Sequence, residues 1–357
     1  MDVAEFDFDL PESLIAQEPP PERGGSRLLV LRRRDGAITH TRFADIGNLL
    51  RRGDVLVVND TRVFPARLLG HRVPSGGAVE CLLVREVPSP KSQVPNPKEQ
   101  TWEALMHPGQ KLKPGTRVVF ERDGVRLHGE VLERHFFGRR TIRLWTDEGD
   151  VATAIDRIGH IPLPPYIKRD DRPSDRERYQ TVYARHGGSI AAPTAGLHFT
   201  DAILADLESR GVLRTSVTLH VGYGTFKPVR SERVEEHVVD PESFVVSPET
   251  TAALTAARRE GRRIIAVGTT TVRALESLTI GADGSVLPAS GETGTFIHPG
   301  HRFRVIDGLV TNFHLPRSSL LMLVAAFAGR EPVLHAYREA IEQGYRFYSY
   351  GDAMLII

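Results

Sequence analysis

The feature of this 357-residue sequence that most constrains its fold is a long stretch without any helical pattern. From about residue 64 to residue 154, apolar and polar residues alternate in short runs such as AVECLLVREV, TRVVFE and RTIRLWTD. Turns rich in Gly and Pro separate these runs at close intervals. Because strands that bury one face show this alternation, the stretch predicts a small all-β barrel or sandwich.

The sequence that follows this stretch alternates between helical and strand-like segments. Helices are predicted over 200–211, 247–261 and 331–344, with Thr200 and Ser247 as N-caps. Another helix begins in GTTTVRALES, and strands are expected in SVTLHV and RIIAV. The C-terminal YRFYSYGDAMLII is expected to form two short strands around Ser349–Asp352. The pattern is typical of an α/β domain.

The two patterns together define a fold class. We expect an α/β main domain with a mixed, barrel-like sheet, interrupted by a small all-β barrel domain. Residues 1–63 and 155–357 are assigned to the main domain, and 64–154 to the insertion. Within the insertion, residues 87–100 contain four prolines and little apolar surface, so we expect a mobile loop there.

Composition excludes several classes of protein. Cys81 is the sole cysteine, which rules out an intrachain disulfide and a cysteine-based metal cluster. The net charge of +1 does not by itself indicate a nucleic-acid-binding protein. The acidic N-terminus lacks the pattern of a signal peptide, and the longest apolar runs are too short to span a bilayer. We therefore expect a cytoplasmic protein without a membrane partner.

Three histidines are candidate functional residues because each lies where a predicted strand meets a loop. They are His198 in TAGLHFT, His220 in VTLHVGYGTF and His314 in TNFHLP. Ligands collect at the carboxyl ends of strands in α/β sheets. A structural histidine is the alternative at each position. Since the three lack the spacing of a helical zinc motif and have no obvious carboxylate partner, no metal site is expected.

Short hydroxyl and glycine residues surround these histidines. The stretch SIAAPTAGLHFT (189–200) carries no charge other than a possible one on His198, and contains Thr194 and Gly196. In AVGTTTVRALES, Gly268, Thr269 and Thr270 precede a helix whose free N–H groups attract a carboxylate or phosphate. A capped helix without a ligand is the equal alternative.

Two further segments offer charged or aromatic groups. In NDTRV, Asp60 is a candidate base or ribose acceptor and Arg62 a phosphate ligand, with a local ion pair as the alternative. In FYSYGD, Tyr348 is a candidate for stacking on an unpaired base, although alternating aromatics more often belong to a core. Residue chemistry alone thus indicates an α/β enzyme with a nucleoside-like ligand, and leaves its reaction open.

Longer motifs in a fixed order carry a family resemblance. DFDLPESLIAQ, GDVLVVNDTRVFPARL, APTAGLHFT, VTLHVGYGTF, AVGTTTVRALES, TNFHLP and YRFYSYGDAMLI occur in succession along the chain. From about residue 5 to its C-terminus, the sequence resembles the S-adenosylmethionine:tRNA ribosyltransferase-isomerase family of queuosine biosynthesis. Gly294 and Asp240 depart from the pattern of that family, where Asp and His are expected.

The resemblance implies an unusual reaction. S-adenosylmethionine would donate its ribosyl part to 7-aminomethyl-7-deazaguanine at the wobble position of a tRNA. Epoxyqueuosine-tRNA, adenine and methionine would be the products. S-adenosylmethionine would be a consumed co-substrate, and no metal or redox cofactor is implied.

Roles within that reaction follow from residue chemistry and are our hypotheses. His198, His220 and Asp60 are the catalytic candidates, because a base must remove a proton beside the sulfonium or from the acceptor amine. The alternatives to this function are an RNA methyltransferase and an RNA-binding module without catalytic activity. The remaining candidates would bind the substrate (Thr194, Gly196, Gly268, Thr269, Thr270, Arg273 and His314) or the tRNA (Arg62, Arg169, Arg317 and Tyr348).

Overall fold

The computed structural model describes residues 1–88, 96–226 and 229–357 and divides into two compact units. The larger unit comprises Met1–Arg62, Pro165–Arg169 and Arg178–Ile357. The smaller unit comprises Val63–Pro164 and Asp170–Glu177. Of the loop predicted over 87–100, residues 89–95 lie outside the described residues.

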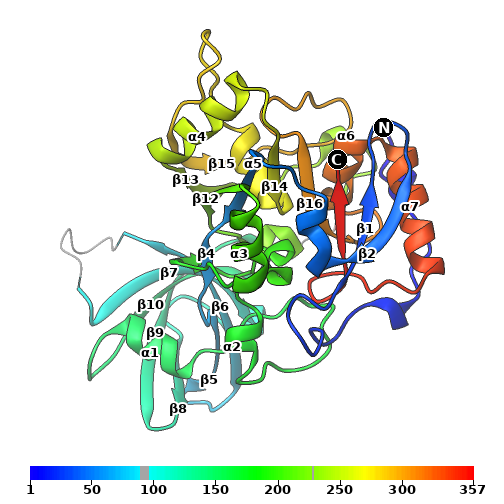
Figure 1. Ribbon diagram of the computed structural model, residues 1–357. Coiled ribbons are helices and arrows are strands. Elements are labelled where there is room, and N and C mark those ends of the chain that lie inside the picture. Colours follow the sequence, from blue (N-terminus) through cyan, green and yellow to red (C-terminus); the bar gives the residue numbers. More distant parts are fainter. Residues whose placement is uncertain (89–95, 227–228) are drawn as a thin grey trace. The chain divides into compact units, whose positions relative to one another are not determined.

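A nine-stranded mixed sheet forms the centre of the larger unit (Figure 1). Four neighbouring strands, β12, β3, β14 and β16, are parallel to one another. β17 runs antiparallel to β16 and parallel to β1. In spatial order the strands are β15 (Ala289–Thr293), β13 (Glu242–Val246), β12 (Leu213–Leu219), β3 (Val55–Asn59), β14 (Ile264–Val267), β16 (Gly308–Asn312), β17 (Ala353–Ile356), β1 (Arg27–Leu31) and β2 (Ile38–Arg42).

The sheet is open, which corrects the barrel-like sheet predicted for this unit. β15 and β2 are its two edges and do not pair with each other. Both edge strands are mostly exposed and carry polar residues, as in the sequences ASGET and ITHTR. Polar, solvated edge strands resist further pairing, so closure of the sheet is not favoured.

The central strands bury side chains on both faces. Along β3, Val55 and Val57 enter one hydrophobic cluster, whereas Leu56 and Val58 enter another. β1, β14, β16 and β17 divide their residues in the same way. Since successive side chains of a strand point to opposite faces, continuous apolar runs such as VLVV require helices or turns on both sides.

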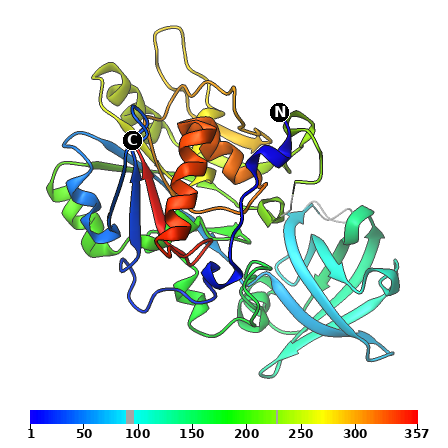
Figure 2. The ribbon, with the colours of Figure 1, turned by 90° about the vertical axis from the view of Figure 1, so that its right-hand side faces the viewer.

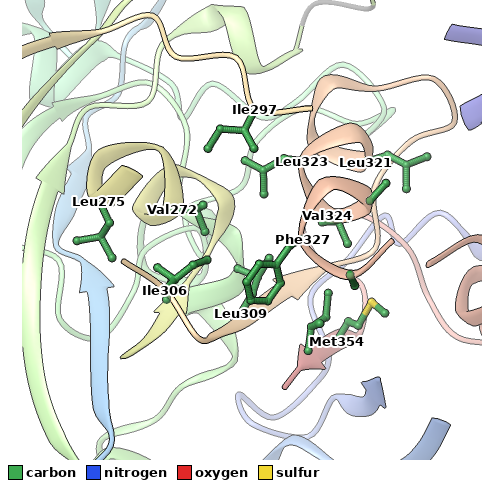
Figure 3. Close-up of a cluster of buried hydrophobic side chains, with 14 of the residues drawn as sticks. Val272, Leu275, Ile297, Ile306, Leu309, Leu321, Leu323, Val324, Phe327 and Met354 are labelled. Carbon is green, nitrogen blue, oxygen red and sulfur yellow. The ribbon is translucent and has the colours of Figure 1, made fainter. Parts of the chain in front are cut away.

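The two faces are covered by different helices. The first cluster includes residues of α4 (Pro248–Arg259), α5 (Thr269–Glu276), α6 (Ser319–Ala328) and α7 (Arg330–Glu342). Figure 3 shows part of it, where Val272 of α5 and Phe327 of α6 lie near Leu309 of β16. Figure 2 shows α7 lying along the sheet. The second cluster includes residues of α3 (Asp201–Ser209) and of the 3-10 helix η3 (Phe43–Asn48).

The predicted helix starts are confirmed by their capping bonds. The Thr200 side chain accepts a hydrogen bond from the N–H of Ile203 at the start of α3. The Ser247 side chain accepts one from Thr250, with Pro248 at the first position of α4. No helix of the described residues is both long and apolar enough to cross a membrane.

The prediction of two strands at the C-terminus is half wrong. Only β17 forms, and residues 345–352 make turns. The Asp352 carboxylate accepts hydrogen bonds from the N–H groups of Arg27 and Arg346, and Tyr348 adopts a left-handed conformation with a φ of 71°. The aromatic residues of this segment alternate because they pack into the core, rather than because they lie on a strand.

The smaller unit contains a closed, six-stranded antiparallel barrel. Strands such as Ala78–Val87 and Arg139–Trp145 bury alternate residues over most of their length, as the sequence pattern predicts. α1 (Val151–Ile158) contacts β8 and β9, and its N-cap is the side chain of Asp150. In spatial order the barrel strands are β10 (Arg139–Trp145), β7 (Glu99–His107), β6 (Ala78–Val87), β5 (Arg67–Val73), β8 (Arg117–Arg122) and β9 (Val125–Arg134). Outside the large sheet and the barrel, the chain also forms β4 (Thr61–Val63), β11 (His186–Ser189), the short helix α2 (Asp175–Arg178) and several 3-10 helices.

Leu309 offers a test of the core. It is fully buried in β16, so Leu309→Ala should lower the free energy of unfolding by about 3 kcal/mol through lost contacts and a residual cavity. Leu213 in β12 is 49% exposed and is a matched control whose change to Ala should cost less than about 0.5 kcal/mol. Urea denaturation measures both, and equal effects would contradict the assigned core.

Candidate active site

A pocket lies where the parallel strands of the larger unit end. Because β12, β3, β14 and β16 are parallel, their carboxyl ends meet at one edge of the sheet. The segments that follow β14 and β16 both reach the pocket, as does the segment before β17. Residues 191–195, which precede α3, complete it together with Tyr166 and Tyr179.

The pocket lining is uncharged. Apart from Asn312, its described residues are small, aliphatic, hydroxyl-bearing or aromatic, and they include no Asp, Glu, Lys or Arg. Six of the candidates from the sequence line it, namely Thr194, Gly268, Thr269, Thr270, His314 and Tyr348. Residues from seven separate segments of the chain, between Tyr166 and Ser349, thus converge on one cavity.

Two stacked tyrosines form one wall of the pocket. The rings of Tyr166 and Tyr348 have centroids 4.4 Å apart and planes inclined by 22°. The Tyr166 hydroxyl bonds Ser349 Oγ at 2.5 Å, and burial raises the pKa of Tyr166 to about 12. The Tyr348 hydroxyl is buried and has no hydrogen-bond partner among the described residues.

A series of hydrogen bonds behind the pocket fixes the side-chain amide of Asn312. The Asn312 Nδ2 group donates to the carbonyl of Tyr348 at 3.0 Å and to His198 Nε2 at 3.2 Å. His198 Nδ1 then donates to Ser26 Oγ at 2.9 Å. Both imidazole nitrogens are thus engaged, whereas Asn312 Oδ1 is buried without a described partner.

His198 is neutral at physiological pH. It is only 4% exposed, and its burial, followed by the nearby Arg23 guanidinium, lowers its pKa to about 4. Burial also lowers the pKa of His314 to about 3, and His314 Nε2 lies 2.9 Å from Thr311 Oγ1. His314 lines the pocket, whereas His198 does not.

A second polar cluster surrounds His220. Its Nδ1 lies 2.8 Å from Thr61 Oγ1, and no described residue bonds its Nε2. Burial, followed by His186, lowers the pKa of His220, while Asp60 opposes this shift. Asp60 accepts a hydrogen bond from Thr218 Oγ1 at 2.6 Å and lies 3.8 Å from His186 Nε2.

The His220 cluster adjoins the pocket without lining it. Val221, the next residue after His220, belongs to the lining. From the end of β3, Asn59 Nδ2 lies 3.3 Å from the hydroxyl of Thr270, which also lines the pocket. His220 and Asp60 are therefore neighbours of the cavity and of each other.

The start of α5 contributes backbone donors to the pocket. Gly268 has a φ of 90°, which a residue with a Cβ adopts only with strain, and it leads directly into Thr269 at the first helical position. Since the first N–H groups of a helix lack intrahelical partners, they favour an anion at this place.

Two predicted substrate ligands, Arg273 and Gly196, lie outside the pocket lining. The Arg273 guanidinium pairs with Glu242 and donates to the carbonyls of Thr293 and Thr295, so none of its nitrogens is directed to the pocket. Gly196 is needed for packing, because a Cβ there would lie 2.2 Å from the Tyr183 hydroxyl. Neither residue lines the cavity.

The predicted tRNA ligands are dispersed. Arg62 is exposed, Arg169 bonds Glu18 at 3.0 Å, and Arg317 pairs with Asp7. Arg317 lies outside the pocket, although its neighbour Ser318 lines it. Of the two positions that differ from the expected family pattern, Gly294 has open space around it, and Asp240 packs against Gly224.

Sequence reasoning missed several residues of the site. Tyr166, Tyr179, Thr311, Asn312 and Ser349 line the pocket but were not among the candidates. Asn312 offered a signal, since it ends a predicted strand within TNFHLP beside the chosen His314. Tyr166 offered none, because its partner Tyr348 is 182 positions away in the sequence.

The buried histidines make stability depend on pH. Each has a folded pKa below its unfolded value of about 6.5, so the unfolded chain binds the proton first and stability falls as the pH drops below 6.5. From pH 6.5 to 5.5, each should lower the free energy of unfolding by about 1 kcal/mol. Urea titrations should show a weaker pH dependence in His198→Gln, and an unchanged dependence would refute the burial of a neutral His198.

Gly196 tests the packing of the loop before α3. Gly196→Ala should lower the free energy of unfolding by about 1–3 kcal/mol, because the new methyl group overlaps the Tyr183 hydroxyl and the Thr181 methyl. Gly187→Ala is the matched control, since a Cβ at Gly187 meets nothing within 4 Å. Thermal denaturation that gives the same result for both variants would contradict the described contact.

Comparison with known proteins identifies the family of the chain. The family model described as "Queuosine biosynthesis protein" matches residues 3–356. S-adenosylmethionine:tRNA ribosyltransferase-isomerases from Heliobacterium modesticaldum and Moorella thermoacetica are 52% and 49% identical over 357 residues, covering 100% of each chain. A crystal structure of S-adenosylmethionine tRNA ribosyltransferase from Thermotoga maritima is 38% identical, covers 99% of this chain and 100% of its own, and gives a TM-score of 0.54. The chain therefore belongs to the queuosine biosynthesis protein family.

Proposed function

We propose that this protein transfers and isomerises the ribosyl part of S-adenosylmethionine onto 7-aminomethyl-7-deazaguanine in tRNA. The products are epoxyqueuosine-tRNA, adenine and methionine. The full-length relatives at about 50% identity carry this proposal, because they share the name S-adenosylmethionine:tRNA ribosyltransferase-isomerase. S-adenosylmethionine is consumed, and the proposal requires no metal or other cofactor.

The uncharged pocket suits a sulfonium nucleoside. The faces of tyrosine rings attract cations, and Tyr166, Tyr179 and Tyr348 all belong to the lining. Without an acidic residue nearby, the sulfonium is not neutralised by an ion pair, and the protons beside it stay acidic. Amide and hydroxyl dipoles then orient the ligand in a medium of low dielectric constant.

Polar groups of the lining suit the adenine and the methionine ends of S-adenosylmethionine. Asn312 Oδ1 is a buried acceptor without a described partner, and it suits an amino group such as that of adenine. The start of α5, with Thr269 and Thr270, suits the methionine carboxylate. Arg273 does not take part, because Glu242 and two carbonyls occupy its guanidinium.

We assign the base to His220. Its lowered pKa keeps it neutral at physiological pH, and its Nε2 is free of described partners. Thr61 orients the ring, and Asp60 stabilises the imidazolium that forms when the proton is taken. His198 is a positioning residue, because both of its nitrogens serve to hold Asn312 and Ser26.

Contacts to tRNA are assigned to cationic groups outside the pocket. Arg62 is exposed, and Arg169 and Arg317 can exchange their carboxylate partners for phosphate. Tyr348 remains a candidate for stacking on the everted base, since its ring lines the cavity. Affinity for tRNA should fall with salt as phosphate contacts are screened.

The proposal includes the domain organisation. We infer that the barrel is an insertion in the α/β domain, because the larger unit combines residues before Val63 with residues after Pro164. The proposed α/β segments 1–63 and 155–357 then form the catalytic domain, and 64–154 the inserted barrel. A protein that acts on tRNA is expected in the cytoplasm.

Adenine release tests the assigned base. His220→Ala should lower kcat at least 100-fold, since general bases contribute about that much or more. The wild-type kcat should fall in acid with an apparent pKa below 6.5, because only neutral His220 accepts a proton. Liquid chromatography measures adenine. If kcat of His220→Ala still fell in acid with the same apparent pKa, the assignment of His220 as the base would be refuted.

The same assay tests the roles of Asp60 and His198. Asp60→Ala and His198→Ala should lower turnover less than His220→Ala, because neither contacts the reacting atoms in the proposed arrangement. Near wild-type turnover in all three variants would refute the roles assigned to His220, Asp60 and His198. Production of S-adenosylhomocysteine instead of adenine and methionine would indicate a methyltransferase.

A further inference from the structure

The hairpin that joins β9 and β10 exposes two adjacent phenylalanines. Phe136 is 87% exposed and Phe137 is 90% exposed. Large apolar side chains at such exposure contribute no core packing and increase the risk of aggregation. The pair belongs to the barrel unit, whereas the candidate active site belongs to the α/β unit.

The backbone of this hairpin holds an unfavourable conformation at one of the two rings. Phe137 has a φ of 55° and a ψ of 37°, in the left-handed region where bulky residues are rare. Gly138 follows with a φ of 82°. Glycine or asparagine would adopt the Phe137 conformation with less strain, so local structure does not explain a phenylalanine there.

Positive charge surrounds the two rings. Arg140 is 1% exposed, and its guanidinium donates to the carbonyls of Gly109, Leu112 and Arg139, with no carboxylate partner among the described residues. Arg134 likewise makes no described ion pair. Glu133, the carboxylate nearest in sequence to the two rings, lies 3.6 Å from His135.

These groups share a depression on the barrel surface. Its lining combines both phenylalanines with cationic and amide side chains, and consists of Gly109, Gln110, Arg134, His135, Phe136, Phe137, Gly138 and Arg140. Arg140 stabilises this surface, since it links the 109–112 turn to the hairpin through two hydrogen bonds, to the carbonyls of Gly109 and Leu112. We refer to these eight residues as the aromatic tip.

We propose that the aromatic tip binds unpaired nucleotides of the tRNA by stacking bases on Phe136 and Phe137. Aromatic side chains stack on bases of any sequence, and they require bases whose faces are not already covered by neighbours in a helix. Arg134 and Arg140 provide the field that attracts the phosphates between those bases. This inference rests on the proposed function for the identity of the RNA.

The charges of the tip favour RNA over a protein partner. An apolar protein interface has a contiguous core of apolar residues and is depleted of charge at its centre. Here two arginines and a histidine line the same depression as the rings. Stacking on bases beside phosphates uses both features together.

Three double variants separate stacking from apolar contact. F136A/F137A removes both rings, F136L/F137L keeps apolar side chains without aromatic faces, and F136Y/F137Y keeps the faces. Fluorescence anisotropy with labelled, unmodified tRNA measures Kd for the full-length protein. We expect the Ala and Leu variants to bind about tenfold or more weakly, and the Tyr variant to bind within about twofold of wild type.

Matched controls accompany these variants. Val238 is 85% exposed and lies in the other unit, so Val238→Ala should leave Kd unchanged. A single-stranded oligonucleotide should compete with labelled tRNA more strongly for wild type than for F136A/F137A. A blunt duplex should compete equally for both. Arg134→Gln should weaken tRNA binding and reduce the dependence of log Kd on log salt by about one. Thermal denaturation verifies that each variant remains folded.

The outcomes distinguish this proposal from the proposed function. If wild type releases adenine and the Ala variant keeps the wild-type Kd and KM for tRNA, the aromatic tip does not bind RNA. If the Leu variant binds as well as wild type, the tip makes an apolar contact, and stacking is excluded. If wild type binds tRNA through the tip but releases no adenine, the proposed function fails while the tip proposal stands. A rise in KM for tRNA with an unchanged kcat supports the tip.

Discussion

Burial of both faces of the central strands is the constraint on which the rest of the α/β unit depends. Val55 and Val57 of β3 pack on one side of the sheet, and Leu56 and Val58 pack on the other. A shift of register by one residue would exchange these two sets, so the strand positions are strongly specified. That fixed register aligns the carboxyl ends of four parallel strands, and the pocket forms where the segments after them meet.

The uncharged pocket depends on how the surrounding charges are paired. Arg273 and Glu242 neutralise each other behind the start of α5, and Asp60 is held by Thr218 beside the His220 cluster. Buried charges without partners would be costly, and pairs outside the lining avoid that cost. The cavity itself is thereby left to rings, hydroxyl groups and one amide.

Much of the fold could be predicted from local sequence. The caps Thr200 and Ser247 are recognisable because their bonds join residues three positions apart. The barrel strands were recognisable by their alternating apolar and polar residues. The turns at 345–352 were not, because the Asp352 carboxylate that shapes them bonds Arg27, which is 325 positions away.

The site was predictable to a lesser degree. Strand-end position predicted Thr269, Thr270 and His314 as substrate ligands, and the polar loop before α3 predicted Thr194; all four line the pocket. Sequence could not separate a histidine that lines the cavity from one that stands behind it, because both follow strands or loops of similar composition. Nor could it reveal the pairing of Arg273, whose partner Glu242 is on another strand.

The orientation of Asn312 has a consequence for selectivity. Its NH2 group is committed to the Tyr348 carbonyl and to His198, so the amide cannot rotate to present a donor to the cavity. A purine with an exocyclic amine opposite Oδ1 would form a hydrogen bond. A purine with a carbonyl at the same position would bring two lone pairs together and leave both unsatisfied. In the proposed complex with an adenine-containing substrate, the fixed amide would therefore favour an amino-purine over an oxo-purine without any charged residue.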